Sequence, residues 1–390
     1  MDAFQPQSGP EVSLHETIMR ALPGFFREAT LVVGTEKTYH ALFTHHLYQV
    51  GMPRDRVARE VALEGRKKVD VVVFEAAVRG DFSLSESARV AVEFKGGAYG
   101  NRNALSDTVK PDSSVEDIDK LAALPEAALA RWFICVDLPR LGRALGEREI
   151  ANVASLAASK GVNFAYGCAG EEVFWVRPQD GDLHTLPLAT MPDEAGSPKV
   201  SSGLFAHNGQ LARWLNRHAA GLRGSEDVLV SQVYHALRKG GFRAQQVSLE
   251  TYFSFAAGKN RMQYRPDLCL FGPGVGGNFN LYRAGQRSDS NDALKLHQLR
   301  AIVEVKGSVA SARQSDRRLH ELFSKDLDKL VMWQTRAKEA AQQLGVGCEF
   351  QSVFVGAYLR ERPLAGRPRV ELEARATENG IQYLHLDLSS

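Results

Sequence analysis

The feature that most constrains this chain is an ordered set of charged residues that occurs twice. In each half, a glutamate at a predicted helix start precedes an aspartate in a strand-like run, then Glu-x-Lys and Asp-x-Asp-Lys-Leu. The two sets are Glu36, Asp70, Glu93, Lys95 and Asp117, and then Glu226, Asp267, Glu304, Lys306 and Asp326. Matched glutamates and aspartates are 190, 197, 211 and 209 positions apart, so the order holds while loop lengths differ. The pattern predicts an internal duplication.

The flanking sequence predicts an α/β fold, because helical and strand-like segments follow one another in the same order in both halves. Helical patterns cover 14–27, 35–51, 209–220, 225–240 and 325–330, with another beginning near 115. Strand-like runs cover 69–74, 89–95, 132–136, 266–271, 301–306 and 352–357, with two short strands within 161–177. We expect an N-terminal domain at 1–184, a Pro/Gly/Ser-rich linker with a short helix at 185–224, and a C-terminal domain at 225–390.

Composition excludes several classes of protein. Of 390 residues, 44% are hydrophobic and 24% charged, which is typical of globular proteins and excludes a mostly disordered chain. The net charge of +2 does not indicate a histone-like binder, so any nucleic-acid contact would use local basic patches. Four scattered cysteines predict reduced thiols and no zinc site. With no signal-like start and no uncharged apolar run of ~18 residues, we expect a cytoplasmic protein without membrane contact.

The Glu-x-Lys triplets point to metal chemistry. Residues two apart on a strand face the same side, so Glu93 and Lys95 project together, as do Glu304 and Lys306. A hairpin with the preceding strand would bring an aspartate beside each glutamate. Two carboxylates on neighbouring strands form an oxygen site suited to Mg²⁺, and the lysine could polarise an attacking water. A helix glutamate could add a third carboxylate.

This arrangement resembles the PD-(D/E)XK nuclease superfamily, the restriction-endonuclease-like fold, in both halves. The resemblance covers about 36–140 and 226–360. The second copy has the literal Pro266-Asp267, whereas the first has Val69-Asp70. The resemblance implies two tandem restriction-endonuclease-like α-β-β-β-α-β domains forming a pseudo-dimer, each a mixed central sheet flanked by helices, and hydrolysis of phosphodiesters that depends on Mg²⁺ or Mn²⁺.

The resemblance also implies roles for individual residues. Aspartate and glutamate hold the metal with the backbone carbonyl of the triplet's middle residue, the lysine assists the water, and the helix glutamate helps hold a second metal. The implied catalytic residues are Asp70, Glu93, Lys95, Asp267, Glu304 and Lys306. The implied metal ligands are Asp70, Glu93, Phe94 and Glu36, and Asp267, Glu304, Val305 and Glu226.

Each of these residues also has a plainer interpretation. The triplets could form same-face salt bridges, and the helix glutamates could simply favour the helix dipole. Asp-x-Asp-Lys segments are commonly solvated helix positions, and we interpret the histidines at 40, 45, 46 and 235 as packing residues. Basic residues after the triplets could neutralise phosphates or form ordinary charged surface. They are Arg102, Lys110, Arg313, Arg317 and Arg318.

Together these patterns predict an endonuclease with two active sites in one chain, which suits cleavage of both strands of duplex DNA. By analogy with the superfamily, restriction or phage defence is the expected setting. The alternatives are a non-catalytic nucleic-acid-binding scaffold and a nickase with one working site. The chain has no helix-turn-helix and no Walker A signature, so local loops or a protein partner would supply recognition or activation.

Overall fold

The structure of the protein is a computed structural model. It describes residues 13–62, 68–77, 87–96, 111–124, 129–138, 144–190, 204–205, 209–218, 225–257, 260–279, 289–307, 315–358 and 366–387. Below, the first half means described residues up to 190, and the second half means those from 225. Of the residues predicted to bind nucleic acid, Arg102, Lys110 and Arg313 lie outside the described residues.

The first half is built on a seven-stranded mixed sheet in the order β1-β2-β3-β4-β5-β6-β7. Its strands are β1 (Val57–Ala62), β2 (Lys68–Phe74), β3 (Ala88–Gly96), β4 (Ala130–Asp137), β5 (Asn163–Cys168), β6 (Val173–Arg177) and β7 (His184–Pro187). Its helices are α1 (Leu14–Ala29), α2 (Glu36–Gln49), α4 (Pro111–Ala122) and α5 (Glu147–Ser159).

The second half is built on a five-stranded mixed sheet in the order β14-β13-β12-β11-β8, with a separate β9-β10 hairpin. The strands are β8 (Val247–Leu249), β9 (Phe253–Ala257), β10 (Asn260–Tyr264), β11 (Leu268–Phe271), β12 (Leu299–Lys306), β13 (Gln351–Tyr358) and β14 (Ile381–Asp387). The helices are α7 (Glu226–Lys239), α8 (Asp289–Gln298), α10 (Asp316–Gln343) and α11 (Gly366–Glu378); α6 (Gln210–His218) precedes them.

The two sheets share the arrangement of five strands. In each, the first three are antiparallel neighbours and the next two are parallel additions. The fourth strand is reached through α4 in the first half and α10 in the second, and the fifth through α5 and α11. Parallel neighbours require such a crossover, which explains the helix between the third and fourth strands. The first half therefore contains the element order α-β-β-β-α-β, and the second half contains the same order with the β9-β10 hairpin and α8 inserted, within an α/β fold of two mixed sheets.

The register of the central hairpin is also the same in both halves. Val71 pairs with Val92 in the first half, and Leu268 pairs with Val303 in the second. Both ladders shift register at the matching place, before Phe74 and before Phe271. The apolar side chains of these strands are buried, and a one-residue slip would move them to the other face of the sheet. Burial therefore fixes the position of the charged residues within each strand.

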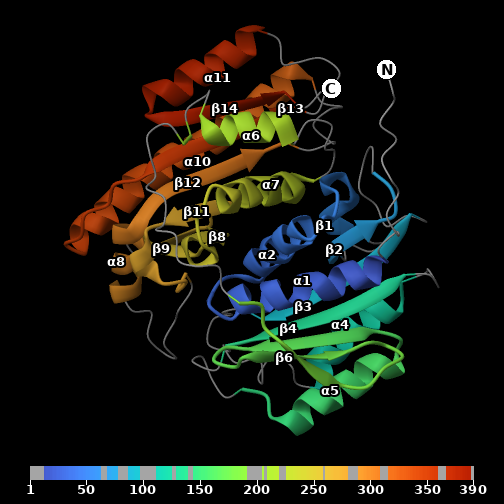
Figure 1. Ribbon diagram of the computed structural model, residues 1–390. Coiled ribbons are helices and arrows are strands. Elements are labelled where there is room, and N and C mark those ends of the chain that lie inside the picture. Colours follow the sequence, from blue (N-terminus) through green and yellow to red (C-terminus); the bar gives the residue numbers. More distant parts are fainter. Residues whose placement is uncertain are drawn as a thin grey trace, which may run out of the picture.

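The halves meet through α2 and α7, which lie side by side between the two sheets (Figure 1). The contact joins residues that are themselves 190 positions apart: Lys37 pairs with Asp227 at 3.3 Å, and the Nδ1 atoms of His45 and His235 lie 2.9 Å apart. Two further hydrogen bonds across this contact correspond to each other, because their donors are 190 positions apart and so are their acceptors. The hydroxyl of Thr35 donates to the carbonyl of Leu249, and that of Ser225 donates to the carbonyl of Arg59.

Most of the predicted segments are present, with some corrections at their ends. The helix expected from 115 begins at Pro111, and the one expected at 325–330 is part of the 28-residue α10. Asp267 was expected within a strand, but β11 begins one residue later, since Pro266 cannot donate to a ladder. β7 includes residues 185–187 of the predicted linker. Sequence patterns did not predict β1, α5, β7–β10, α8, α11 or β14.

No helix among the described residues combines the length and apolar character that crossing a membrane requires.

Candidate active site

The aspartate of each half is held by the backbone of the Glu-x-Lys triplet. The N–H of Phe94 donates to Asp70 Oδ2 at 2.8 Å, and the N–H of Val305 donates to Asp267 Oδ2 at 2.7 Å. The shared hairpin register produces this contact, because the pairs Val71–Val92 and Leu268–Val303 bring each aspartate level with the glutamate of its triplet. The structure therefore brings the predicted aspartate to the predicted triplet in both halves.

Of the four carboxyl groups at these positions, Glu93 and Glu304 are buried and Asp70 and Asp267 are half-buried, and all four have raised pKa values. Burial raises the pKa of Asp70 to about 6, and burial together with the negative charge of Asp70 raises the pKa of Glu93 well above its usual value. In the second half, burial raises the pKa of Glu304 to about 7, while burial and the charges of Glu304 and Glu226 raise that of Asp267. In each pair the nearby lysines do not offset burial and the repulsion between carboxylates, and a bound cation would relieve that imbalance.

The two lysines are held by further carboxylates. Lys95 Nζ donates to Asp117 Oδ2 at 2.8 Å, and Lys306 Nζ contacts Asp326 Oδ2 at 3.5 Å. Burial favours the neutral amine, but the neighbouring carboxylates outweigh it and raise the pKa of both lysines. The lysines are therefore cations at neutral pH, suited to binding an anion.

The helix glutamates lie beside these lysines. Glu226, at the start of α7, places Oε2 3.0 Å from Lys306 Nζ, and the charge of Glu36, at the start of α2, helps to raise the pKa of Lys95. The two helices also match at their other ends, where each is followed within two residues by a glycine with positive φ, 100° at Gly51 and 94° at Gly241. The predicted helix residues therefore lie within reach of the same groups as the triplets.

The Asp-x-Asp-Lys-Leu segments contribute side chains to both candidate sites, whereas the plainer interpretation made them solvated helix positions. Besides Asp117 and Asp326, Lys120 enters the first site, where Nζ lies 2.5 Å from the buried Glu93 Oε2. In the second half, Lys329 Nζ lies 2.5 Å from Asp326 Oδ1 instead. Their recurrence at a constant spacing of 209 positions was the sequence signal for this role.

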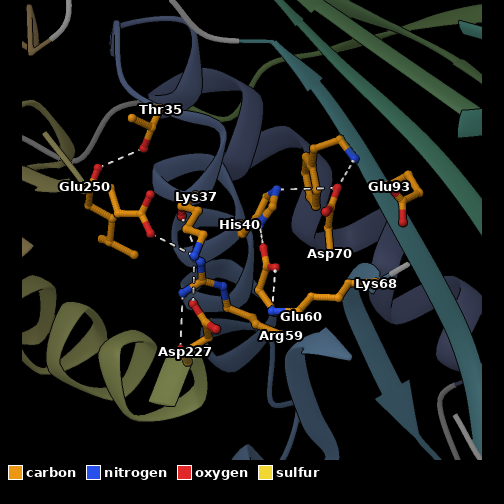
Figure 2. A network of polar contacts seen from close by, with 12 residues as sticks. Thr35, Lys37, His40, Arg59, Glu60, Lys68, Asp70, Glu93, Asp227 and Glu250 are labelled. Carbon is orange, nitrogen blue, oxygen red and sulfur yellow. Dashed lines mark hydrogen bonds and ion pairs between the residues drawn. The ribbon is translucent and has the colours of Figure 1, made fainter. Parts of the chain in front are cut away.

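The two sites differ in the group that approaches the carboxylates. In the first half, His40 of α2 lies between Asp70 and Glu60, as Figure 2 shows. In the second half, the hydroxyl of Tyr264, from the β9-β10 hairpin, donates to Glu304 Oε1 at 2.6 Å. Helical spacing alone gave His40 no partner, although its position four residues after Glu36 places both on one helix face. No sequence pattern marked Tyr264.

The predicted nucleic-acid contacts within the described residues are at the surface. Arg317 and Arg318 lie in the first turn of α10, where both pair with Glu321 at 3.2 and 3.3 Å. The Arg317 side chain is 90% exposed, so this pairing leaves it accessible to solvent.

Comparison with known proteins found no match among protein-family models, curated proteins or solved structures. The candidate site is therefore argued from its geometry. That geometry offers, in each half, a half-buried aspartate, a buried glutamate and a protonated lysine, an arrangement that can hold a divalent cation and bind an anionic group beside it.

Proposed function

We propose that the chain is an endonuclease that hydrolyses phosphodiester bonds with Mg²⁺ or Mn²⁺ at two sites, one in each half. In this proposal each half is a restriction-endonuclease-like unit. One observation carries it: the same aspartate, held by the backbone N–H inside the same Glu-x-Lys triplet, occurs in both halves at 2.8 and 2.7 Å. A salt bridge on a half-exposed strand would not require this contact to recur in both halves.

The residues present fit a divalent metal ion. Glu93 is 2% exposed, and its Oε1 atom has no hydrogen-bond partner among the described residues. In our proposal the ion is held by Asp70 and Glu93 with the Phe94 carbonyl, and in the second half by Asp267 and Glu304 with the Val305 carbonyl. A bound ion would supply Lewis acidity and a lowered pKa for its water.

The chain's own residues would bind and orient the substrate. Lys95 and Lys306, kept protonated by their carboxylate neighbours, would each bind a phosphate oxygen and hold the attacking water near the phosphorus. Asp117 and Asp326 position the ammonium groups.

The contact between the halves supports duplex DNA as the substrate. Glu36 and Glu226 belong to the sites, and the next residue on each helix, Lys37 or Asp227, forms the ion pair between halves. The helix starts that carry the two sites are therefore close together, and we propose that the halves form a pseudo-dimer acting on both strands of one duplex. The proposed setting is restriction or phage defence, in which a protein partner would supply recognition or activation.

Cleavage of supercoiled plasmid tests this function. Wild type, Lys95→Ala, Lys306→Ala and the double variant would be compared in Mg²⁺ and in EDTA, with the exposed Lys338→Ala as control. We expect wild type and Lys338→Ala to linearise the plasmid in Mg²⁺, each single site variant to nick it, and the double variant to leave it intact. No Mg²⁺-dependent cleavage of DNA or RNA by wild type would contradict the proposal and favour a binding scaffold.

A nickase is the second candidate, and the difference between the sites favours it. His40 and Lys120 approach the first pair of carboxylates, whereas Tyr264 approaches the second. If only one site is active, wild type itself should accumulate nicked plasmid, and one of the two lysine variants should retain full activity.

A further inference from the structure

His40 is a buried imidazole without a conventional hydrogen bond. It is 2% exposed, and neither ring nitrogen has a hydrogen-bond partner among the described residues. Nε2 lies 3.4 Å from Asp70 Oδ2, and Nδ1 lies 3.7 Å from Glu60 Oε1. One ligand atom from each of these three residues can be chosen so that all lie within 4.8 Å of one another. A nitrogen donor and two carboxylates therefore converge in the first half (Figure 2).

We infer that His40 and Asp70 bind a first-row transition-metal dication such as Mn²⁺, with Glu60 as the residue that positions the imidazole. Two ligand atoms that each lie ~2.1 Å from one ion are typically 3–3.5 Å apart, which matches Nε2 and Asp70 Oδ2. A carboxylate beside the other ring nitrogen favours the tautomer with the proton on Nδ1, which leaves the lone pair on Nε2 for the ion. The inference deepens the proposed function, because Asp70 would hold the same ion in both.

The surroundings of His40 keep its ring neutral. Burial and the positive charges of Arg59, Lys37 and Lys120 lower its pKa well below the usual value. A neutral imidazole is the form that ligates metals. It also forms no strong ion pair with Asp70 or Glu60; Glu60 has its cation partner in Lys68 at 3.5 Å, and Asp70 has the N–H of Phe94 at 2.8 Å.

The second half lacks this donor. Val230 occupies the position that matches His40, 190 residues later. Glu250 matches Glu60 and has the same unusual backbone, with φ of 47° against 52°. Its carboxylate, however, pairs with Lys37 at 2.8 Å and Arg265 at 3.8 Å. The second site would therefore be an all-oxygen site suited to Mg²⁺, whereas the nitrogen of His40 shifts the first towards transition metals.

Titration of the full chain with Mn²⁺ in excess Mg²⁺ tests the inference, with free Mn²⁺ measured by electron paramagnetic resonance. We expect wild type to retain one Mn²⁺ per chain against Mg²⁺. His40→Val, which installs the residue of the second half, should weaken Mn²⁺ binding at least about tenfold, and Glu60→Gln should weaken it about tenfold. His297→Val, which removes an exposed histidine of α8, should bind as wild type does.

Two results would overturn the inference: a wild type with no Mn²⁺-selective site, or tight Mn²⁺ binding that survives in His40→Val. Circular dichroism in EDTA checks that His40→Val folds, and unchanged Mn²⁺ binding in Glu60→Gln contradicts the positioning role independently. Plasmid cleavage in Mg²⁺ alone separates this inference from the proposed function. If cleavage is normal while Mn²⁺ selectivity is absent, only the metal assignment fails.

Discussion

The two candidate sites share their backbone and differ in how their buried charge is compensated. Hairpin register, register shift and the N–H bond to the aspartate all match between the halves. In the first half, the ammonium of Lys120 reaches Glu93; in the second, the neutral hydroxyl of Tyr264 reaches Glu304. The comparison teaches that the placement of the carboxylates is common to both halves, whereas the group that faces them is specific to each.

The first prediction concerns the contact between the halves, where the two halves differ. The residue 190 positions after Glu28 is His218, so no carboxylate occupies the matching position. Burial alone would raise the pKa of Glu28, but Arg238 and His46 outweigh it and lower the pKa to about 2. The side chain is 15% exposed, so the ionised form stabilises the native state by about 3 kcal/mol. Glu28→Gln should lose about that much stability above pH 4.5, measured by urea unfolding.

Because the pKa of Glu28 is lowered on folding, its contribution should disappear as the pH falls from 4.5 towards 2. The difference between wild type and Glu28→Gln should shrink over that range. A difference that stays constant with pH would show that Glu28 is not ionised in the folded state.

The second prediction compares two matched lysines. Lys120→Met leaves Glu93, whose side chain is 3% exposed, without its ammonium partner and should cost about 2 kcal/mol in urea unfolding. Lys329→Met removes a 55% exposed ammonium from Asp326 and should cost less than about 1 kcal/mol. Equal losses in the two variants would contradict the difference in charge compensation.

The third prediction isolates Tyr264. In a Lys95→Ala background, where only the second site would act, Tyr264→Phe removes the donor to Glu304 and should slow Mg²⁺-dependent nicking about tenfold, since one hydrogen bond contributes about 1 kcal/mol or more. In a Lys306→Ala background the same substitution should leave nicking unchanged. Slower nicking in both backgrounds would show that Tyr264 acts on the whole fold.

The sequence predicted the parts of the site that rest on local pattern. Glu93 and Lys95 lie on one strand, and recurrence of the set in the second half marked Asp70 and Asp267 as their companions. The approach of His40 to Asp70 depends on how α2 packs on the sheet, which no spacing within α2 reveals. Tyr264 reaches Glu304 through a hairpin whose strands carry no clear alternation, and β8 has only three residues, too few for a periodic signal.

The most direct test of the account is anomalous X-ray scattering from crystals of the full chain soaked in Mn²⁺ at a concentration that fills both sites. The account predicts two manganese peaks per chain, one bound by Asp70 and Glu93 and one by Asp267 and Glu304. Crystals of Asp70→Asn should lose the first peak, and those of Asp267→Asn the second. Well-diffracting wild-type crystals with no peak at either pair of carboxylates would contradict the central claim that each half holds a divalent metal ion.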